Sequence, residues 1–317
     1  MEIIKNLGGH HNRKLFSIIT PCYNSSKSIR NVFSSLKNLN NQDFEWIVIN
    51  DASTDKTIEI LKEFLDEVNF QITIYNLKEN KMATYGYHLG IEEATGDFII
   101  FLDHDDQIKS NALDRFIENW DSLSTNQQEK LAGMIALCED ENGNIVGTKF
   151  PKSPKINNFF NMIFGHKVRG EKFFCYKNKV MKENNFQLVD RYVPESNLIY
   201  KISSKYETLF FNESLRVYNL PQKNTSNLSN LDPFQYSLGF RLNYLDLLNN
   251  YSSQLSAKPY TLVSFMYNFS IYSCYSKTNI KLCFFELKSY FHKVILFPIY
   301  IYARILFALK TFSLVEK

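Results

Sequence analysis

The sequence predicts an α/β fold built on a mainly parallel sheet, and three observations support this class. Short apolar runs alternate with stretches in which apolar residues recur at helical spacing. The joints between them are short, as in repeated strand–helix–strand units. The run DFIIFL at 97–102 is nearly all apolar, as a strand covered on both faces must be.

Each element follows from its local pattern. The apolar run FSIIT at 16–20 ends at Pro21 and predicts a buried strand. Apolar residues spaced by three and four positions predict a helix over 26–39. The same patterns, in order along the chain, predict strands at 45–50, 71–77, 97–102 and 131–138, helices at 54–68 and 81–94, a short helix at 156–164, and a helix at 194–203 that starts with proline.

Composition and breakers divide the chain into three parts. With 317 residues, 44% hydrophobic and 22% charged, it has the mix of a globular protein. We expect a polar, mobile arm at 1–14, an α/β domain at 15–220 and a helical appendage at 221–317. The appendage opens with a breaker-rich linker and continues with helices at roughly 233–250, 258–275 and 280–312. The arm lacks the apolar core of a signal peptide, so we expect no export.

Charge, cysteines and missing motifs exclude several function classes. The formal net charge of +3 is too small to indicate a nucleic-acid binder. The five cysteines form no C-x-x-C pair, which favours a reducing compartment without disulfides or a zinc site. The chain has no G-x-G-x-x-G, no G-x-x-x-x-G-K-[ST] and no G-x-S-x-G. Dinucleotide oxidoreductases, P-loop phosphotransferases and α/β-hydrolases therefore lose their support.

An acidic cluster marks the end of one predicted strand. Asp103, Asp105 and Asp106 lie within four residues, and carboxylates this close repel unless a cation or solvent relieves them. In α/β sheets ligands bind beyond the carboxyl ends of the strands. Carboxylate oxygens suit Mg²⁺ or Mn²⁺, which proteins usually share with substrate phosphates. The alternative is a solvated acidic turn or a helix cap. His104 either touches a ligand or is a spacer.

Two further sets of residues leave alternatives open. Asp51 and Asp55 follow the second strand; capping of the next helix accounts for Asp55 but not for Asp51. A carboxylate in the position of Asp51 can accept hydrogen bonds from a base or a ribose. Arg169, Glu171 and Lys172 stand beside aromatic residues, in either an acceptor groove or a surface turn with ion pairs of little weight.

Four segments in this order resemble the family 2 glycosyltransferases, which have the nucleotide-sugar-binding GT-A fold. They are SIITPCYNSSKSI (17–29), WIVINDASTDKT (46–57), NKMATYGYHLGIEEATGDFIIFLDHDD (80–106) and YVPES (192–196). The third ends in a D-x-D element. The resemblance covers about residues 15–220. Within the family, GEKF and the segment 192–218 look most like enzymes that assemble bacterial surface polysaccharides.

The resemblance implies a role for each matching residue in donor binding. Pro21, Tyr23 and Asp51 would frame the nucleotide base, usually uracil. Asp103 would lie at the ribose and metal side, and Asp105 would coordinate Mn²⁺ or Mg²⁺. A divalent ion on the diphosphate stabilises the leaving group as a Lewis acid.

Glu195 would take the proton from the acceptor hydroxyl. The chain departs from the family at three places: His104 stands where many members have Ser, Glu195-Ser196 where they have Glu-Asp, and Asn80-Lys81 where they have Asn-Gly. A helix start at Pro194 also weakens a carboxylate as a base, because the helix dipole stabilises its anion.

The expected function is an inverting, metal-dependent transfer from a nucleotide sugar, expected to be a UDP-sugar, to a saccharide or lipid-linked acceptor. It belongs in surface polysaccharide biosynthesis. Processive synthases of this family carry Q-x-x-R-W, which is missing here. Two alternatives remain. A sugar nucleotidyltransferase would open with a Gly-rich, Arg-containing loop where this chain has 21–24, PCYN. A non-catalytic binding subunit would not need the Asp103/Asp105 pair or Glu195.

The last apolar segment suggests a membrane surface. VILFPIYIYA at 294–303 is too short to span, and Pro298 is expected to kink it. Lys293, Arg304 and Lys310 would meet anionic headgroups. We therefore expect a cytoplasmic protein at the inner face of the cell membrane, in contact through 280–312. The alternative is a core helix packed on the catalytic domain or on a partner subunit.

Overall fold

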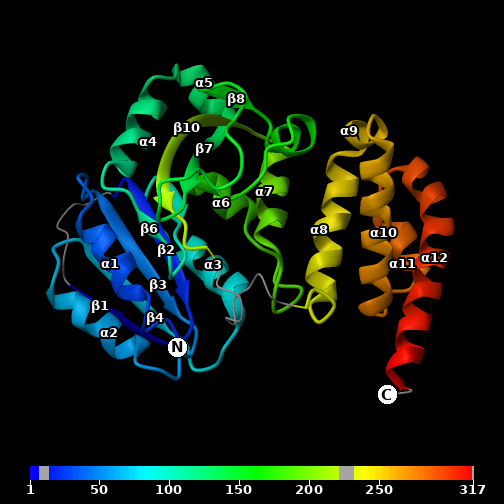
Figure 1. Cartoon of the computed structure of the whole chain (residues 1–317), viewed down its shortest axis with the longest axis horizontal. Coiled ribbons are helices and arrows are strands. Elements are labelled where there is room, and N and C mark those ends of the chain that lie inside the picture. Colours follow the sequence, from blue (N-terminus) through cyan, green and yellow to red (C-terminus); the bar gives the residue numbers. More distant parts are fainter. Residues whose placement is uncertain (7–13, 221–231, 316–317) are drawn as a thin grey trace. The chain divides into compact units, whose positions relative to one another are not determined.

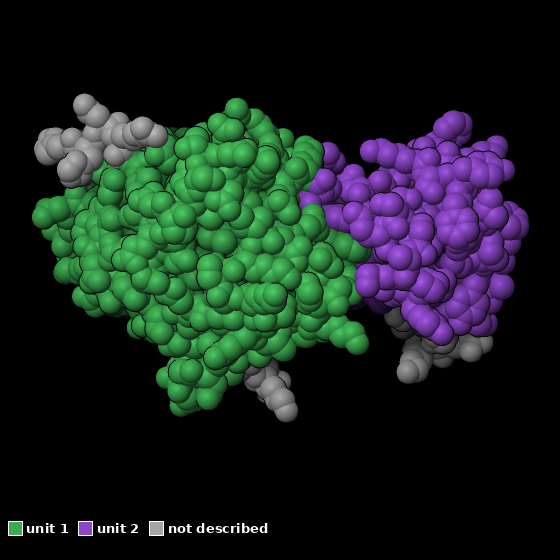
Figure 2. Space-filling view, turned by 90° about the horizontal axis from the view of Figure 1, so that it is seen from above, with its two compact units in different colours: residues 1–185, 205–225 green, residues 186–204, 226–317 purple. Residues whose placement is uncertain are grey.

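The computed structural model describes residues 1–6, 14–220 and 232–315, and the chain divides into two compact units. One unit comprises residues 1–185 and 205–225, and the other comprises residues 186–204 and 226–317 (Figure 2). The predicted linker at 221–231 and residues 7–13 of the predicted arm lie outside the described residues.

The first unit is built on one sheet of ten strands (Figure 1). Its strand order is β1-β4-β3-β2-β5-β9-β7-β10-β6, with β8 paired to β10. The central strands β4, β3, β2 and β5 run parallel, and β9 is antiparallel to both β5 and β7. The strands are β1 (Glu2–Lys5), β2 (Phe16–Cys22), β3 (Phe44–Asn50), β4 (Gln71–Asn76), β5 (Phe98–Phe101), β6 (Gln107–Ile108), β7 (Leu131–Glu139), β8 (Lys155–Asn157), β9 (Lys172–Lys177) and β10 (Glu207–Val217).

Helices cover both faces of this sheet, which explains why its central strands are almost entirely buried. On one face of the sheet, Ile18 and Trp46 belong to a hydrophobic core that they share with α1, α2 and α4. On the other face α3 lies so close to β2 that a Cβ at Gly90 would stand 2.3 Å from Ile19 Cγ2. The helices are α1 (Ile29–Lys37), α2 (Thr57–Glu63), α3 (Met82–Glu93), α4 (Ala112–Asp121), α5 (Thr125–Lys130) and α6 (Asn178–Asn184), with a 3₁₀ turn (Phe64–Asp66) and a π-helix (Asn161–Gly165).

The second unit consists of helices, and α10 packs against both α8 and α12. An ion pair between the buried Arg241 of α8 and the half-buried Glu286 of α11 joins two of them, and Arg241 Nε also donates to Ser273 Oγ of α10 at 3.0 Å. The helices are α7 (Glu195–Ser203), α8 (Ser237–Asn250), α9 (Ser252–Ser256), α10 (Pro259–Tyr275), α11 (Ile280–Glu286) and α12 (Tyr290–Val315).

The α/β class is confirmed, but three predicted boundaries differ from the structure. Residues 2–5 of the predicted arm form β1, because their backbone pairs with the exposed edge of β4. The predicted helix at 156–164 is instead the end of β8 followed by the π-helix. The helix α7 belongs to the helical unit and not to the sheet domain, because it packs along α8. There the Tyr251 hydroxyl donates to the Tyr200 carbonyl at 2.7 Å.

The last helix also differs from its prediction. Pro298 lies inside α12 without ending it, so the helix runs through 26 residues. Its segment Tyr290–Leu309 is long and apolar enough to cross a membrane, by length and composition alone. The expectation that this region is too short to span is therefore wrong as a statement about length.

Candidate functional site

The loops that follow β2 and β3 are joined by hydrogen bonds at the carboxyl edge of the sheet. Asn24 Oδ1 accepts a hydrogen bond from the Thr54 backbone N–H at 2.8 Å, and the Asn24 N–H donates to Ser53 Oγ at 2.9 Å. The Ser26 N–H donates to Asp55 Oδ2 at 3.1 Å. These contacts hold the two loops as one rigid rim, and they explain Asp55 as a structural residue.

Asp51 sits in this rim and is nearly inaccessible to solvent. Its two carboxylate oxygens accept hydrogen bonds from the backbone N–H groups of Lys81 and Met82, each at 2.7 Å. Ala52 and Met82 both adopt positive φ angles, 58° and 69°. Strained backbone of this kind is common where a site is preorganised. The Asp51 carboxylate therefore fixes the start of α3.

Pro21 and Tyr23 stand at the end of β2 with different exposures. Pro21 is buried and pairs with Ile49 of β3, so it shapes the floor beneath the rim. A Cβ at Gly86 of α3 would lie 2.8 Å from Pro21 Cβ, so the helix and the strand are in close contact. Tyr23 is 45% exposed and presents its ring to solvent. Tyr23 is therefore available to a ligand.

An arginine side chain that the sequence analysis did not identify offsets the charge repulsion within the acidic cluster. Arg216 of β10 donates from Nη2 to Asp103 Oδ2 at 2.5 Å and pairs with Asp106 as well. The Tyr87 hydroxyl donates to the other oxygen of Asp103, and the Asn219 N–H donates to Asp106 Oδ1 at 2.8 Å. Burial is the largest single influence on Asp103 and opposes its ionisation, but the charge of Arg216, the hydrogen bonds from Arg216 and Tyr87 and the charge of His104 together lower the pKa of that carboxyl. One signal was visible: an arginine in an otherwise apolar stretch, LRVY.

Asp105 is placed differently from its two acidic neighbours. It is half-buried, and its carboxylate makes no hydrogen bond or ion pair to another residue within the described ranges. Burial raises its pKa, and the nearby charge of Asp103 adds to that rise. Its oxygens are thus open to a ligand, and they are of the kind that Mg²⁺ and Mn²⁺ prefer.

The donor set fits a divalent ion that takes part of its coordination from a substrate. Among the described residues no three His, Cys, Asp or Glu side chains are grouped as a metal cage. Arg216 pairs with both Asp103 and Asp106, but Asp106 is fully buried, whereas Asp103 and Asp105 are partly exposed at the edge. His104 lies beside them, with Nδ1 3.3 Å from Ser28 Oγ, which ties this loop to the start of α1.

The loop before β9 is held by its own lysine. Lys172 is buried, and its Nζ donates to the carbonyls of Arg169, Gly170 and Glu171 at 2.7, 3.2 and 3.0 Å. Thr148 and Arg169 exchange further bonds at 2.9 and 3.1 Å. Lys172 is therefore a structural residue of this turn, whereas Glu171 is exposed beside it.

Glu195 is the first residue of α7, directly after the Pro194 N-cap, and belongs to the helical unit. Neighbouring residues fix this helix end: Asn197 Nδ2 donates to Asp246 Oδ2 at 2.8 Å, and Ser196 Oγ lies 3.4 Å from Asn243 Oδ1. Glu195 is half-buried. This position at the first turn of α7 is the one that the sequence predicts from Pro194, and the expectation that the helix dipole stabilises the ionised form of Glu195 stays a prediction.

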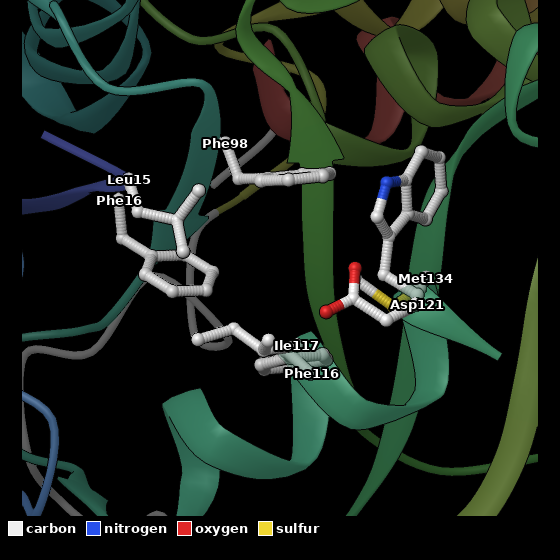
Figure 3. Close-up of a pocket in the computed structure, with 8 residues that line it drawn as sticks. Leu15, Phe16, Phe98, Phe116, Ile117, Asp121 and Met134 are labelled. Carbon is white, nitrogen blue, oxygen red and sulfur yellow. The ribbon is translucent and has the colours of Figure 1, made fainter. Parts of the chain in front are cut away.

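The pocket in Figure 3 lies away from all of these residues. Phe16 and Phe98, which line it, begin β2 and β5, so it opens at the amino ends of the strands rather than at the carboxyl edge. Its volume is about 40 Å³, room for a water molecule or two and far too little for a nucleotide sugar. The lining is apolar apart from Asp121. It is a packing defect beside Trp120, not a candidate site.

Comparison with known proteins places this geometry in context. The model of the family "Glycosyl transferase family 2" matches residues 17–184. A relative from Bacillus subtilis, the putative teichuronic acid biosynthesis glycosyltransferase TuaG, is 32% identical over 106 residues, which is 33% of this chain and 42% of that protein. The chain spans about half, or less, of the length of the first curated relatives that it matches.

Solved structures share the fold at low sequence identity. The Staphylococcus aureus TarS fragment 1–349 in complex with UDP-GlcNAc superposes with a TM-score of 0.60 at 16% identity, covering 93% of this chain and 92% of that one. The mannosyltransferase PcManGT from Pyrobaculum calidifontis, in complex with GDP-Man and Mn²⁺, superposes with a TM-score of 0.53 at 15% identity, covering 83% and 74%.

Proposed function

Because this chain belongs to glycosyl transferase family 2 and is a glycosyltransferase, we propose that it moves a sugar from a UDP-sugar to a hydroxyl of a saccharide or lipid-linked saccharide acceptor, with inversion at the anomeric carbon. Family membership favours this reaction over nucleotidyl transfer and over a non-catalytic binding role. One observation carries the proposal: Asp51, in the rim with positive φ angles, and Asp105, whose carboxylate has no side-chain partner among the described residues, follow strands that end at the same edge of the sheet.

The rim supplies the nucleotide side of the proposed site. Asp51 would contact the base or the ribose from this rim, Tyr23 offers an exposed ring, and Pro21 forms the floor. The hydrogen bonds between the two loops hold them rigid before a ligand binds, which reduces the loss of conformational entropy on binding. The TarS fragment crystallised with UDP-GlcNAc has this fold, which supports a uridine nucleotide as the first donor to test.

Asp105 and Asp103 would hold Mn²⁺ or Mg²⁺. When bound, such an ion stabilises the negative charge of the departing diphosphate as a Lewis acid. Arg216 keeps Asp103 ionised and fixed in direction, because it donates to one of its oxygens while Tyr87 donates to the other. The PcManGT structure holds Mn²⁺ with GDP-Man in the same fold, which supports a metal-dependent reaction.

Glu195 would act as the general base toward the acceptor. Its carboxylate would take the proton of the acceptor hydroxyl as that oxygen attacks the anomeric carbon and the bond to the diphosphate breaks. One in-line displacement inverts that carbon. The setting we propose is cytoplasmic assembly of a bacterial surface polysaccharide, in line with the teichuronic acid biosynthesis for which TuaG is named.

A nucleotide screen tests the donor side of this proposal directly. Nucleoside diphosphates and nucleotide sugars are added to the full chain with Mn²⁺ or with EDTA, and the melting temperature is recorded. A ligand present at about 100 times its Kd stabilises a protein by about 2.7 kcal/mol, so UDP with Mn²⁺ should raise the melting temperature clearly. Equal shifts in EDTA would refute the metal role, and no shift with any uridine nucleotide would refute the donor assignment.

A further inference from the structure

The helix α12 has two faces with opposite environments. Its buried face recurs every three or four residues at His292, Leu296, Tyr300 and Ala303, which pack toward α10 and α11. The Tyr300 hydroxyl donates to the Thr278 carbonyl at 2.8 Å. These contacts make α12 an integral layer of the helical unit (Figure 1).

The opposite face of α12 is apolar and exposed along its described length. Single exposed hydrophobic residues are normal on a protein surface, but a continuous row of them along one helix is not. The exposed face of α12 carries such a row of large hydrophobic side chains. Their spacing of three and four positions keeps them on one side of the helix. They are Tyr290, Phe291, Val294, Phe297, Ile301, Tyr302, Ile305 and Leu309. Phe285 of the neighbouring α11 is 85% exposed.

The charge around this face has one sign. Lys288, Lys293 and Arg304 are the charged residues of 287–309, and the sequence has no aspartate or glutamate between Glu286 and Glu316. Cations beside an apolar face complement anionic headgroups, each worth about 1 kcal/mol near such a surface. Association of two copies through this face would instead bring like charges together.

We propose that this face of α12 docks on an anionic lipid bilayer, with the helix lying in the plane of the interface. The exposed aromatic residues of this face, Tyr290 and Tyr302 among them, suit the boundary between headgroups and acyl chains. The surface is separate from the proposed transferase chemistry and does not rest on it.

The helix lies flat in this proposal although its length would allow it to cross. Crossing would place Arg304 within the hydrocarbon core, and a cation there costs up to about 2.5–3.5 kcal/mol when it lies at the centre of a helix. It would also strip Leu296, Tyr300 and Ala303 from their packing. A helix that lies flat avoids both costs. Its cations stay at the border of the exposed face, and its buried face stays packed on α10.

Flotation of the full chain with vesicles tests the proposal. Vesicles of phosphatidylcholine with phosphatidylglycerol should carry the protein upward in a density gradient, more weakly at high salt because screening weakens charge attraction. Vesicles of pure phosphatidylcholine should carry much less. Alkaline carbonate should release the bound protein, as it does for proteins that do not span.

A matched pair of variants locates the surface. Ile301→Glu and Leu238→Glu both place a carboxylate at an apolar helical position that is 42% exposed, the first on α12 and the second on α8. Ile301→Glu should weaken partition about tenfold or more, since it removes apolar area and opposes the anionic surface. Leu238→Glu should float like the parent. Circular dichroism melting checks that both variants remain folded.

Four outcomes would overturn the proposal. Full-length protein that stays below the anionic vesicles refutes docking, and an Ile301→Glu variant that floats unchanged refutes this face. Protein that resists carbonate extraction spans the bilayer instead of lying on it. A stable dimer in light scattering that is lost in Ile301→Glu, together with no flotation, assigns the face to a second copy of the chain.

Discussion

Arg216 donates a hydrogen bond to Asp103 at 2.5 Å although 113 positions separate the two residues in the sequence. The same buried guanidinium pairs with Asp106. This protein cation therefore pairs with two of the three clustered carboxylates, and Asp105 is the one that it does not pair with. This division of labour makes the roles of the aspartates separable by mutation.

Replacement of Arg216 by Met should destabilise the sheet domain strongly. The guanidinium is buried, and its removal leaves Asp103 and Asp106 uncompensated, an effect that typically costs about 3–5 kcal/mol. Urea unfolding measures the change. Arg115→Met is the control, because Arg115 pairs with the partly exposed Glu213 and Glu118 and such pairs contribute about 0–1 kcal/mol. Similar losses for the two variants would contradict the role given to Arg216.

Asp105→Asn should abolish most turnover while the fold is unchanged. The Asp105 carboxylate makes no hydrogen bond or ion pair to another described side chain that the substitution would break, whereas loss of a charged group at the diphosphate should cost at least about 10²-fold in rate. Titration calorimetry of UDP should lose its dependence on Mn²⁺. Asp66→Asn, at an exposed 3₁₀ turn, serves as the control. Metal-dependent binding that survives in Asp105→Asn would rule out Asp105 as a ligand.

The strands that frame the site were predictable from sequence, and Arg216 was not. Continuous apolar runs such as 16–20 and 45–50 identify strands buried on both faces, because covering helices leave no polar side. Arg216 lies on a strand whose alternation is irregular, and its partners come from a loop far away in sequence. Such contacts depend on the order of strands in the sheet, which local patterns do not encode.

Asp51→Ala should raise the KM for the donor more than it lowers kcat at saturating donor. A contact to the base or ribose is made equally in ground and transition states, so its loss weakens uniform binding. The variant should also lose about 1–3 kcal/mol of stability, because the N–H groups of Lys81 and Met82 lose their acceptors. Steady-state kinetics with a UDP-sugar separate the two constants. A fall in kcat with unchanged KM would argue against a binding role.

The unit to which Glu195 belongs was also beyond the reach of the sequence. The motif YVPES predicted a helix start correctly, because proline before a helix is a local signal. Nothing local distinguishes a helix that packs on a sheet from one that packs on α8. That choice is made by contacts such as Tyr251 to Tyr200, which join segments 51 positions apart.

Glu195→Gln should keep donor affinity and lose most transfer. The substitution preserves size and removes the basic oxygen, and a general base is commonly worth about 10²–10⁴-fold in rate. Rapid-quench or steady-state assays at saturating donor and acceptor measure kcat, and calorimetry measures UDP affinity. Glu118→Gln, on the surface of α4, controls for the loss of a charge. Weakened donor binding at an unchanged rate would make Glu195 a binding residue.

His292→Leu should stabilise the helical unit and remove part of its pH dependence. His292 is fully buried in α12, and neither ring nitrogen has a hydrogen-bond partner among the described residues. Burial disfavours the charged imidazolium and lowers the pKa of His292 below its ordinary value of 6.5. The folded state therefore binds fewer protons than the unfolded state. The free energy of unfolding is unaffected by His292 above about pH 6.5 and decreases as the pH falls toward the folded-state pKa.

His292→Leu removes this decrease because leucine does not titrate. It also removes a buried polar group without a hydrogen-bond partner among the described residues, which should add about 1–3 kcal/mol to the free energy of unfolding. Urea unfolding between about pH 5 and 8 should show a flatter profile for His292→Leu, whereas His166→Leu, at an exposed position, should follow the parent. Parallel pH profiles of the parent and His292→Leu would show that His292 does not titrate on unfolding.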